Sequence, residues 1–178
     1  MLGNFAPSLA FTLAQEGLWS DSPEDPGRCT MRGITLGAYR AWCAWTGLPE
    51  PGPNDLRNIN DKTLAAIYRD GYWALVNGDG LPEGIDLVLF DASVNTGPST
   101  AAMQLQRILG VTADGDVGPI TLAAAAKASP FVLIANLADA QEAYYRTLAG
   151  FATFGAGWIA RVQRRRSAGM AMASGRGS

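Results

Sequence analysis

Three side chains near the start of the chain have types and spacing suited to acid–base chemistry: Glu16, Asp25 and Thr30. Hydrolysis of a glycosidic bond needs a proton donor for the leaving oxygen. On the other face of the sugar it needs a base that activates water, or a nucleophile. Glu16 would supply the acid, Asp25 the base, and the Thr30 hydroxyl would hold the water. Spacing alone favours a plainer interpretation, in which the acidic residues of this stretch form turns beside prolines and a glycine.

Glu16 continues an apolar helical stripe and is followed by Gly17, a good helix terminator. The stripe consists of Leu2, Phe5, Leu9 and Leu13. We therefore expect Glu16 in the last turn of a helix, on its core-facing side. Burial and the C-terminal end of the helix dipole both disfavour a negative charge there. This position predicts a raised pKa for Glu16 and a carboxyl that stays protonated, as a general acid requires. The alternative is a partly exposed helix-end glutamate without a role.

The composition removes several classes of chemistry. The 178 residues include no histidine and two cysteines, and the net charge is −2. Without histidine there is no Ser-His-Asp or Cys-His catalysis and no His-ligated zinc, so we expect neither a metal nor a cofactor. The charge gives no reason to expect a nucleic-acid partner. Whether Cys29 and Cys43 form a disulfide is left open.

The hydrophobic pattern predicts a mainly α protein with a small β-hairpin near residues 28–36. We expect one domain over residues 1–178, with a lobe at 1–84 that carries Glu16, a helical lobe at 85–167 and a flexible, Gly-rich tail at 168–178. Helices are predicted at 36–45, from 61 to about 75, at 85–95, at 99–109, after Pro119, over Phe131 to Tyr145 and over Phe151 to Val162.

The helix predicted at 85–95 is apolar on nearly all sides, which is typical of a helix buried at the centre of its domain. Two of its polar residues, Asp91 and Asn95, stand four residues apart and so share a face. Such a pair is either hydrogen-bonded internally, where it anchors neighbouring backbone, or lines a wet cleft.

The stretch from Glu16 to Thr35 resembles the signature of family-108 glycoside hydrolases, the N-acetylmuramidases of phages and bacteria. The matching residues are Glu16-Gly17, Asp25-Pro26-Gly27, Thr30 and Gly33-Ile34-Thr35. Further blocks resemble the rest of that family and its associated predicted peptidoglycan-binding region: Tyr72-Trp73, Leu81-Pro82, Phe90 to Gly97, Ala101 to Leu109 and Gly110 to Pro119. The resemblance covers about residues 5 to 165.

The resemblance implies a lysozyme-like helical fold that cuts the β-1,4 bond between N-acetylmuramic acid and N-acetylglucosamine in peptidoglycan glycan strands. It assigns Glu16 as the catalytic acid. Asp25 and Thr30 also resemble the Glu…Asp…Thr arrangement of phage-type lysozymes, where the interval from Asp to Thr is one residue longer. We expect a monomeric phage endolysin. It would be made in the host cytoplasm without a signal peptide and would act on the cell wall or periplasm after release.

The chain departs from the signature at two places. Leu18 and Trp19 follow Gly17 where the family has Gly and Tyr, and Arg28 follows Gly27 where the family has a second Gly. Leu18 would narrow the groove or close over the glutamate. Arg28 would hold Asp25 ionised by its opposite charge. The change at Leu18 keeps open a peptidoglycan-binding or secretion-accessory protein without activity, and a lytic transglycosylase using Glu16 is a further alternative.

Sugar sites favour aromatic faces and side-chain amides, so Trp19, Tyr72, Trp73, Asp91 and Asn95 are candidate substrate-binding residues. For each aromatic residue, core packing is the alternative. Four arginines also gather in the last predicted helix: Arg161, Arg164, Arg165 and Arg166. A run of this kind is usually a solvated face, and the alternative is weak contact with an anionic envelope polymer or membrane surface.

Overall fold

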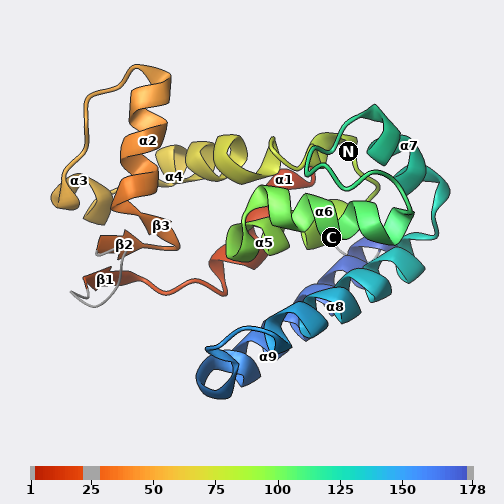
Figure 1. Ribbon diagram of the computed structural model, residues 1–178. Helices are drawn as coiled ribbons and strands as arrows, with labels where there is room; N and C mark the ends of the chain where they lie inside the picture. Colours follow the sequence, from red (N-terminus) through yellow and green to blue (C-terminus); the bar gives the residue numbers. More distant parts are fainter. Residues whose placement is uncertain (1–2, 22–28, 176–178) are drawn as a thin grey trace. The chain divides into compact units, whose positions relative to one another are not determined.

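The computed structural model describes residues 3–21 and 29–175, and it is mainly α-helical with one small antiparallel sheet (Figure 1). The mainly α, lysozyme-like class predicted from the sequence is confirmed. The chain forms two compact units: residues 9–71, called the small unit here, and residues 1–8 with 72–178, called the large unit. The division at 71/72 falls earlier than the predicted one at 84/85, because Trp73, Val76 and Leu81 are all buried in the large unit.

The small unit begins within helix α1, which starts in the large unit. Its elements are the end of α1 (Phe5–Leu13), strands β1 (Trp19–Asp21), β2 (Cys29–Met31) and β3 (Ile34–Thr35), and helices α2 (Leu36–Thr46), α3 (Pro53–Arg57) and α4 (Asp61–Tyr68). The strand order is β1-β2-β3. The predicted hairpin is β2–β3, and β1 is a third strand that the sequence did not indicate, since three residues are too short for a clear alternating pattern.

The turn between β2 and β3 is a two-residue hairpin loop. Met31 pairs with Ile34, and the two residues between them, Arg32 and Gly33, both have positive φ, at 49° and 81°. Two successive residues with positive φ define the type I′ turn, whose twist matches that of the flanking strands. Thr35 then caps α2 by accepting a hydrogen bond from the backbone N–H of Ala38 (3.1 Å).

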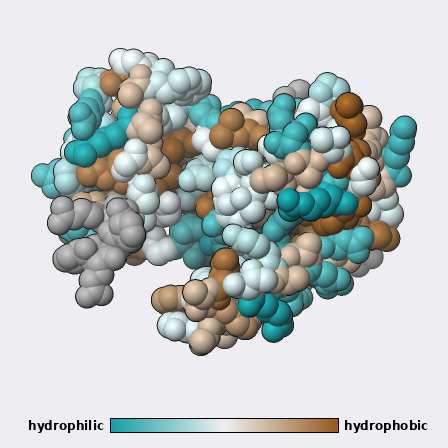
Figure 2. All heavy atoms as spheres, viewed as in Figure 1, coloured by the Kyte–Doolittle hydropathy of each residue, from teal (hydrophilic) through white to brown (hydrophobic). Residues whose placement is uncertain are grey.

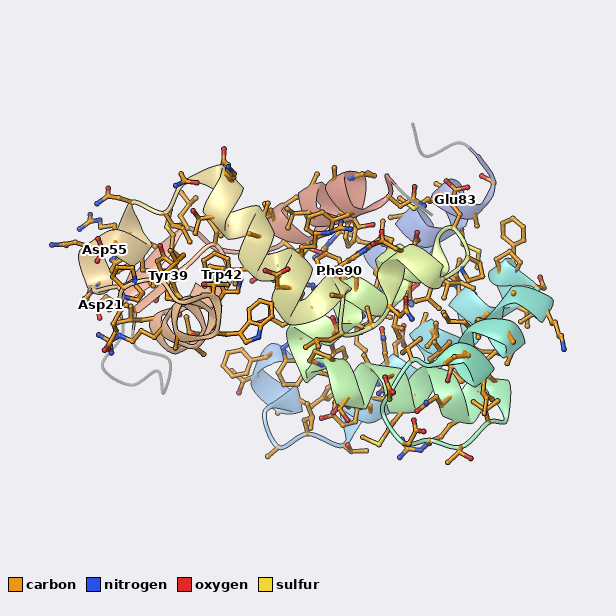
Figure 3. All side chains as sticks on the ribbon, turned by 90° about the horizontal axis from the view of Figure 1, so that it is seen from above. Asp21, Tyr39, Trp42, Asp55, Glu83 and Phe90 are labelled. Atoms are coloured by element: carbon orange, nitrogen blue, oxygen red, sulfur yellow. The ribbon has the colours of Figure 1, made fainter. Side chains whose placement is uncertain are left out.

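The large unit is built around a buried helix, α5 (Ile85–Thr96), with Phe90 in its interior (Figure 3). Around it lie α6 (Pro98–Leu109), α7 (Pro119–Lys127), α8 (Pro130–Arg146) and α9 (Phe151–Ala173). Helices α8 and α9 run side by side as an antiparallel hairpin (Figure 1), and α5 packs on α6, α8 and α9. The apolar pattern of residues 85–95 predicted a buried helix, and every residue from Ile85 to Ser93 is buried. A π turn, η1 (Arg69–Trp73), and a 3-10 turn, η2 (Gly78–Gly80), precede α5.

The predicted flexible tail is wrong for residues 168–173, because α9 continues to Ala173. The reason is a close approach between the last turns of α9 and the start of α5. A Cβ added to Gly169 would lie 2.6 Å from Cγ2 of Val88 and 3.0 Å from the carbonyl oxygen of Gly84. Met172 in the same turns is 6% exposed. The small residues of this segment allow α9 to pack closely against α5 and do not make the segment flexible.

Cys29 and Cys43 are both buried and are not joined in a disulfide, which answers the question that the sequence left open. Burial raises the pKa of the Cys43 thiol, and the charge of Asp55 raises it further. Both effects favour the neutral thiol, which is the less reactive form.

Within the described residues, no single helix combines the length and apolar character needed to cross a bilayer. Helices α7 and α8 meet that test only when taken together, and they are bent by 115° at the break between them.

Candidate active site

Glu16 lies in a turn after α1, not in its last helical turn as predicted. The helix ends at Leu13, and the next backbone N–H groups make shorter-range bonds: Gln15 N–H to the Thr12 carbonyl (2.9 Å) and Glu16 N–H to the Leu13 carbonyl (3.3 Å). These i to i−3 bonds tighten the chain and end the α-helical ladder. The Glu16 side chain is half-buried, so it is neither sealed in the core nor fully in water.

The Glu16 side chain packs against the backbone of Gly33 in the β2–β3 turn. A Cβ added to Gly33 would lie 2.9 Å from Cγ and 3.0 Å from Cδ of Glu16, and it would also collide with the Tyr68 hydroxyl. Glycine is therefore required here twice, for its positive φ and for the close approach of these two side chains. The carboxyl and the phenol thus share one small space in front of the turn.

Tyr68 fixes this turn from inside the small unit. Its ring is 0% exposed, and its hydroxyl donates a hydrogen bond to the carbonyl oxygen of Arg32 (2.8 Å). The Arg32 guanidinium pairs with Asp61 (2.5 Å), and the Arg32 N–H donates to the Leu18 carbonyl (3.4 Å). The last bond ties the turn to the segment that follows Glu16. The turn is held on both sides, so the wall beside the carboxyl is a rigid one.

Leu18 does not close over the glutamate as expected, because its side chain is 76% exposed and so contacts little of the chain. Trp19 is half-buried, and the Arg57 guanidinium lies over its ring at 5.6 Å from the centroid. A cation over the indole is a favourable contact, and it leaves one ring face engaged within the protein.

Thr30 lies on the central strand, opposite Ser20 on β1 and Thr35 on β3. Directly opposed residues in a sheet point to the same face and successive ones to opposite faces. Thr30 therefore shares a face with two other hydroxyl-bearing residues, while Trp19 points to the other face. Asp25, the expected base, and Arg28 beside it lie outside the described residues.

Elsewhere in the small unit, α2 carries a second aromatic group. The rings of Tyr39 and Trp42 lie 6.5 Å apart (Figure 3), and the Trp42 indole N–H donates to the Asp70 carboxylate (2.8 Å). This hydrogen bond joins α2 to Asp70 at the end of the small unit. It also satisfies the indole N–H of Trp42, which accords with a structural role.

Trp73 is not a substrate-binding residue, contrary to the expectation from the sequence. It is 1% exposed in the large unit, and its ring meets those of Phe5 (5.4 Å) and Phe90 (5.5 Å) edge to face. An indole enclosed in this way presents no face to a sugar. Tyr72, the residue before it, is half-buried.

Asp91 is also buried, and it belongs to an ion-pair network that crosses the core of the large unit. Both carboxylate oxygens accept hydrogen bonds from Arg161 (2.7 and 3.1 Å), and one accepts from Nε of Arg165 (2.6 Å). Burial works to raise the pKa of Asp91, but the charge of Arg165 and the hydrogen bonds and charge of Arg161 outweigh it and lower the pKa. Of the two interpretations open for Asp91, internal bonding is the one found. Asn95 differs: it is exposed at the end of α5, and its amide donates to the Tyr145 hydroxyl (3.4 Å).

The four arginines of α9 do not form one basic face. The side chains of Arg165 and Arg161 are 1% and 12% exposed and neutralise Asp91. Arg166 lies 3.5 Å from Asp139, and Arg164 is exposed. The solvated face that such a run usually forms is therefore not found for Arg161 and Arg165, and the alternative, weak envelope or membrane contact, would be left to Arg164 and Arg166. One signal was consistent with this outcome: an aspartate within a largely apolar helix needs a cation or hydrogen-bond donors, and Arg161 and Arg165 are one helical turn apart.

Comparison with known proteins gives the family. Residues 9–97 match the family model described as Glycosyl hydrolase 108, and residues 100–163 match the model described as Predicted Peptidoglycan domain. The chain belongs to glycoside hydrolase family 108. A solved structure, that of Brucella abortus SagA, matches this family-108 hydrolase with 37% identity over 97% of each chain and a TM-score of 0.86. No curated protein matched.

The two matches together identify this family-108 hydrolase as a glycoside hydrolase of peptidoglycan. Their boundary does not coincide with the packing. The hydrolase match includes the small unit and also α5, which packs with the helices of the peptidoglycan-domain match. Sequence reasoning missed Tyr68 as a site residue. The helical stripe placed it in the core, and nothing local indicated that its hydroxyl would reach the turn.

Proposed function

We propose that this family-108 hydrolase is an N-acetylmuramidase, cleaving the β-1,4 bond between N-acetylmuramic acid and N-acetylglucosamine with Glu16 as the general acid. One observation carries the assignment. The half-buried Glu16 carboxyl packs against the side-chain-free backbone of Gly33 in a turn that Tyr68 and Asp61 hold. A proton donor needs a fixed direction toward the glycosidic oxygen, and a rigid wall supplies it.

In this mechanism Glu16 donates its proton to the oxygen between the two sugars while the bond from that oxygen to the anomeric carbon breaks. Water attacks the anomeric carbon from the opposite face and loses a proton to Asp25, with the Thr30 hydroxyl positioning the water. Direct attack inverts the anomeric centre and calls for carboxyls roughly 6.5–9.5 Å apart, whereas a separation of about 5–5.5 Å goes with retention. Thr30 suits its role because its strand face carries the hydroxyls of Ser20 and Thr35.

The test is digestion of purified sacculi followed by mass spectrometry of the soluble products. The wild type is expected to release fragments with a reducing N-acetylmuramic acid end. Glu16→Gln removes the transferable proton and keeps the shape of the side chain, so we expect a loss of about 10²–10⁴-fold in rate. Glu83→Gln is the matched control, because Glu83 is a half-buried glutamate of the large unit with no role in this mechanism, and it should digest like the wild type.

Three results would contradict the proposal, each in its own way. Anhydro-sugar ends would mean that a substrate hydroxyl, not water, attacks, as in a lytic transglycosylase. Equal digestion by the wild type and Glu16→Gln would remove Glu16 from the chemistry. No digestion by the wild type would favour a binding protein. Because peptidoglycan lies outside the inner membrane, the proposed place of action is the cell wall.

A further inference from the structure

The end of the α8–α9 hairpin is an uncharged, partly apolar surface. No charged residue occurs from 147 to 160, between Arg146 and Arg161. Phe154 is 60% exposed, and Tyr144 and Trp158 are half-buried. Figure 2 shows this end of the hairpin as pale and light brown, with little of the teal that marks hydrophilic residues. Exposed apolar surface of this kind usually marks a place where something binds.

Four aromatic rings form a continuous row across the two helices, called the aromatic platform here: Tyr144, Tyr145, Trp158 and Phe154. Successive ring centroids lie 5.8, 5.5 and 6.0 Å apart, with interplanar angles of 49°, 37° and 34°. Tyr145 is 4% exposed and packs in a core cluster with Val162 and Ala138. The row is therefore anchored at one ring and accessible at the others.

Gly150, just before α9, makes room for two of these rings, because a Cβ added there would lie 3.2 Å from Trp158 and 3.3 Å from Phe154. Beside the buried ring of the row, the exposed Asn95 amide donates to the Tyr145 hydroxyl (3.4 Å). Aromatic faces thus lie next to a side-chain amide, which combines an apolar surface with a polar group that can orient a ligand.

We propose that the aromatic platform binds the glycan strand of peptidoglycan, with sugar rings stacked on Phe154 and Trp158 and the Asn95 amide bonded to a hydroxyl or N-acetyl group. The inference deepens the proposed function, since it rests on peptidoglycan as the substrate and adds a binding surface to it. All four rings lie within the residues that match the predicted peptidoglycan domain.

The charges around the platform favour the glycan over the stem peptides. Peptides of the cell wall carry carboxylates and amines, which need ionic partners. The stretch from 147 to 160 offers none. Of the arginines at its two ends, Arg161 binds the buried Asp91, while Arg146 lies over the Phe151 ring at 5.4 Å and 3.8 Å from Glu142, with its side chain 59% exposed. Sugar hydroxyls and acetamido groups are neutral, so they match an uncharged surface with one amide.

Binding is measured on N-acetylglucosamine oligosaccharides, which carry the hydroxyl and acetamido groups of the strand but no charge, and on intact sacculi, with every variant built on Glu16→Gln so that the sacculi are not consumed. We expect Phe154→Ala and Trp158→Ala each to weaken binding about tenfold, as loss of a stacked aromatic ring does. The control is Phe131→Ala, since Phe131 is 45% exposed at the far end of the seventeen-residue helix α8, about 25 Å away, and it should bind unchanged. Because Trp158 packs on Tyr145, Trp158→Phe is included as the variant that preserves this packing, and thermal melting is recorded for all.

The proposal would be overturned if Phe154→Ala and Phe131→Ala both bound as tightly as the Glu16→Gln parent, or if both lost binding equally. Binding only to intact sacculi and not to the neutral oligosaccharides would assign the surface to peptides. Loss of binding to vesicles of phosphatidylethanolamine and phosphatidylglycerol, with glycan binding intact, would assign it to a membrane. The proposed catalysis is tested separately, by comparing the digestion rates of the wild type and of Glu16→Gln, neither of which carries a platform substitution.

Discussion

The two units place a carboxyl group in opposite environments. In the small unit, Glu16 is half-buried beside a turn and faces the backbone of Gly33 and the hydroxyl of Tyr68. In the large unit, Asp91 is 0% exposed and bound by two arginines. From the sequence alone, Glu16 was the candidate catalytic acid and Asp91 a candidate substrate-binding residue.

The difference shows what makes an acidic residue available for reaction. A carboxylate neutralised by two buried guanidinium groups has its lone pairs occupied and its proton affinity lowered, so it holds helices together. The Glu16 carboxyl lies at a turn, half-buried and beside the backbone of Gly33. Large-unit substitutions around Asp91 should therefore change stability, and small-unit substitutions around Glu16 should change activity.

The largest expected effect is from Asp91→Ala. Removing the carboxylate leaves Arg161 and Arg165 buried without their counter-charge, which should lower the free energy of unfolding by about 3–5 kcal/mol. Urea denaturation followed by circular dichroism measures it. Glu16→Gln, the counterpart in the small unit, should change stability by less than about 0.5 kcal/mol. Similar losses of stability in the two variants would contradict the claim that Asp91 stabilises the fold and Glu16 does not.

Gly169→Ala tests the packing of the large unit without touching a charge. The new methyl would meet Val88 and the Gly84 carbonyl, so overpacking should cost about 1–3 kcal/mol with little change in catalytic rate per folded molecule. Gly157→Ala is the matched control on the same helix, because a Cβ there has no atom within 4 Å, and it should be neutral or stabilising. If Gly169→Ala melts like Gly157→Ala, the close contact between α9 and α5 is not as described.

Gly33→Ala is the small-unit counterpart. The positive φ of 81° alone should cost about 1–2 kcal/mol in stability for a residue with a Cβ. The new methyl would in addition push against the Glu16 carboxyl and Tyr68, so we expect the digestion rate of sacculi to fall by at least about tenfold, as misplacement of a reacting group does. Gly37→Ala in α2, whose Cβ would have only Thr35 in ordinary contact, should retain wild-type activity. A Gly33→Ala protein that is destabilised yet fully active would separate this turn from the chemistry.

The smallest expected effect is one of pH on two aspartates of α5. Burial raises the pKa of Asp86 above its ordinary value of 3.8, only partly opposed by hydrogen bonds from Asn4, Leu87 and Gly84. Its contribution to stability is complete below pH 3.8 and is lost as the pH rises through the raised value. Asp91, with its lowered pKa, contributes stability above pH 3.8 that is lost as the pH falls through the folded-state value.

Urea denaturation at a series of pH values between 2 and 7 distinguishes the two aspartates. Relative to Asp86→Asn, the wild type should lose stability as the pH rises; relative to Asp91→Asn, it should gain. Only the slopes are compared, because each substitution also removes a constant amount of stability. Two slopes of the same sign would contradict the opposite environments of these carboxyls.

Local elements were predictable where the signal acts over a few residues. The type I′ turn at Arg32-Gly33 follows the family motif, the α2 helix begins at its Thr35 cap, and helices α6, α7 and α8 each begin with proline. The all-round apolar segment 85–95 identified the central helix. The three-residue strand β1 carried too short a pattern to be found.

The candidate site was only partly predictable, because sequence signals act over a few residues and the site joins residues that are far apart in the chain. The motif pointed to Glu16, Thr30 and the glycine that proved to face the glutamate, but the end of α1 was placed one turn too late. Trp19 and Trp73 looked alike as candidates; one lies under an arginine at a strand and the other is sealed between two phenylalanines.

The sequence by itself determined the family, the mainly helical class and most helix starts, because backbone preferences and capping act between near neighbours. The tertiary structure decided which charges are buried and which aromatic rings are open. Asp91 meets its arginines across 70 and 74 positions of the chain, and Tyr68 reaches the turn across 36. Burial is a property of contacts between distant residues, so the role of an acid or a ring is settled only when the chain has folded.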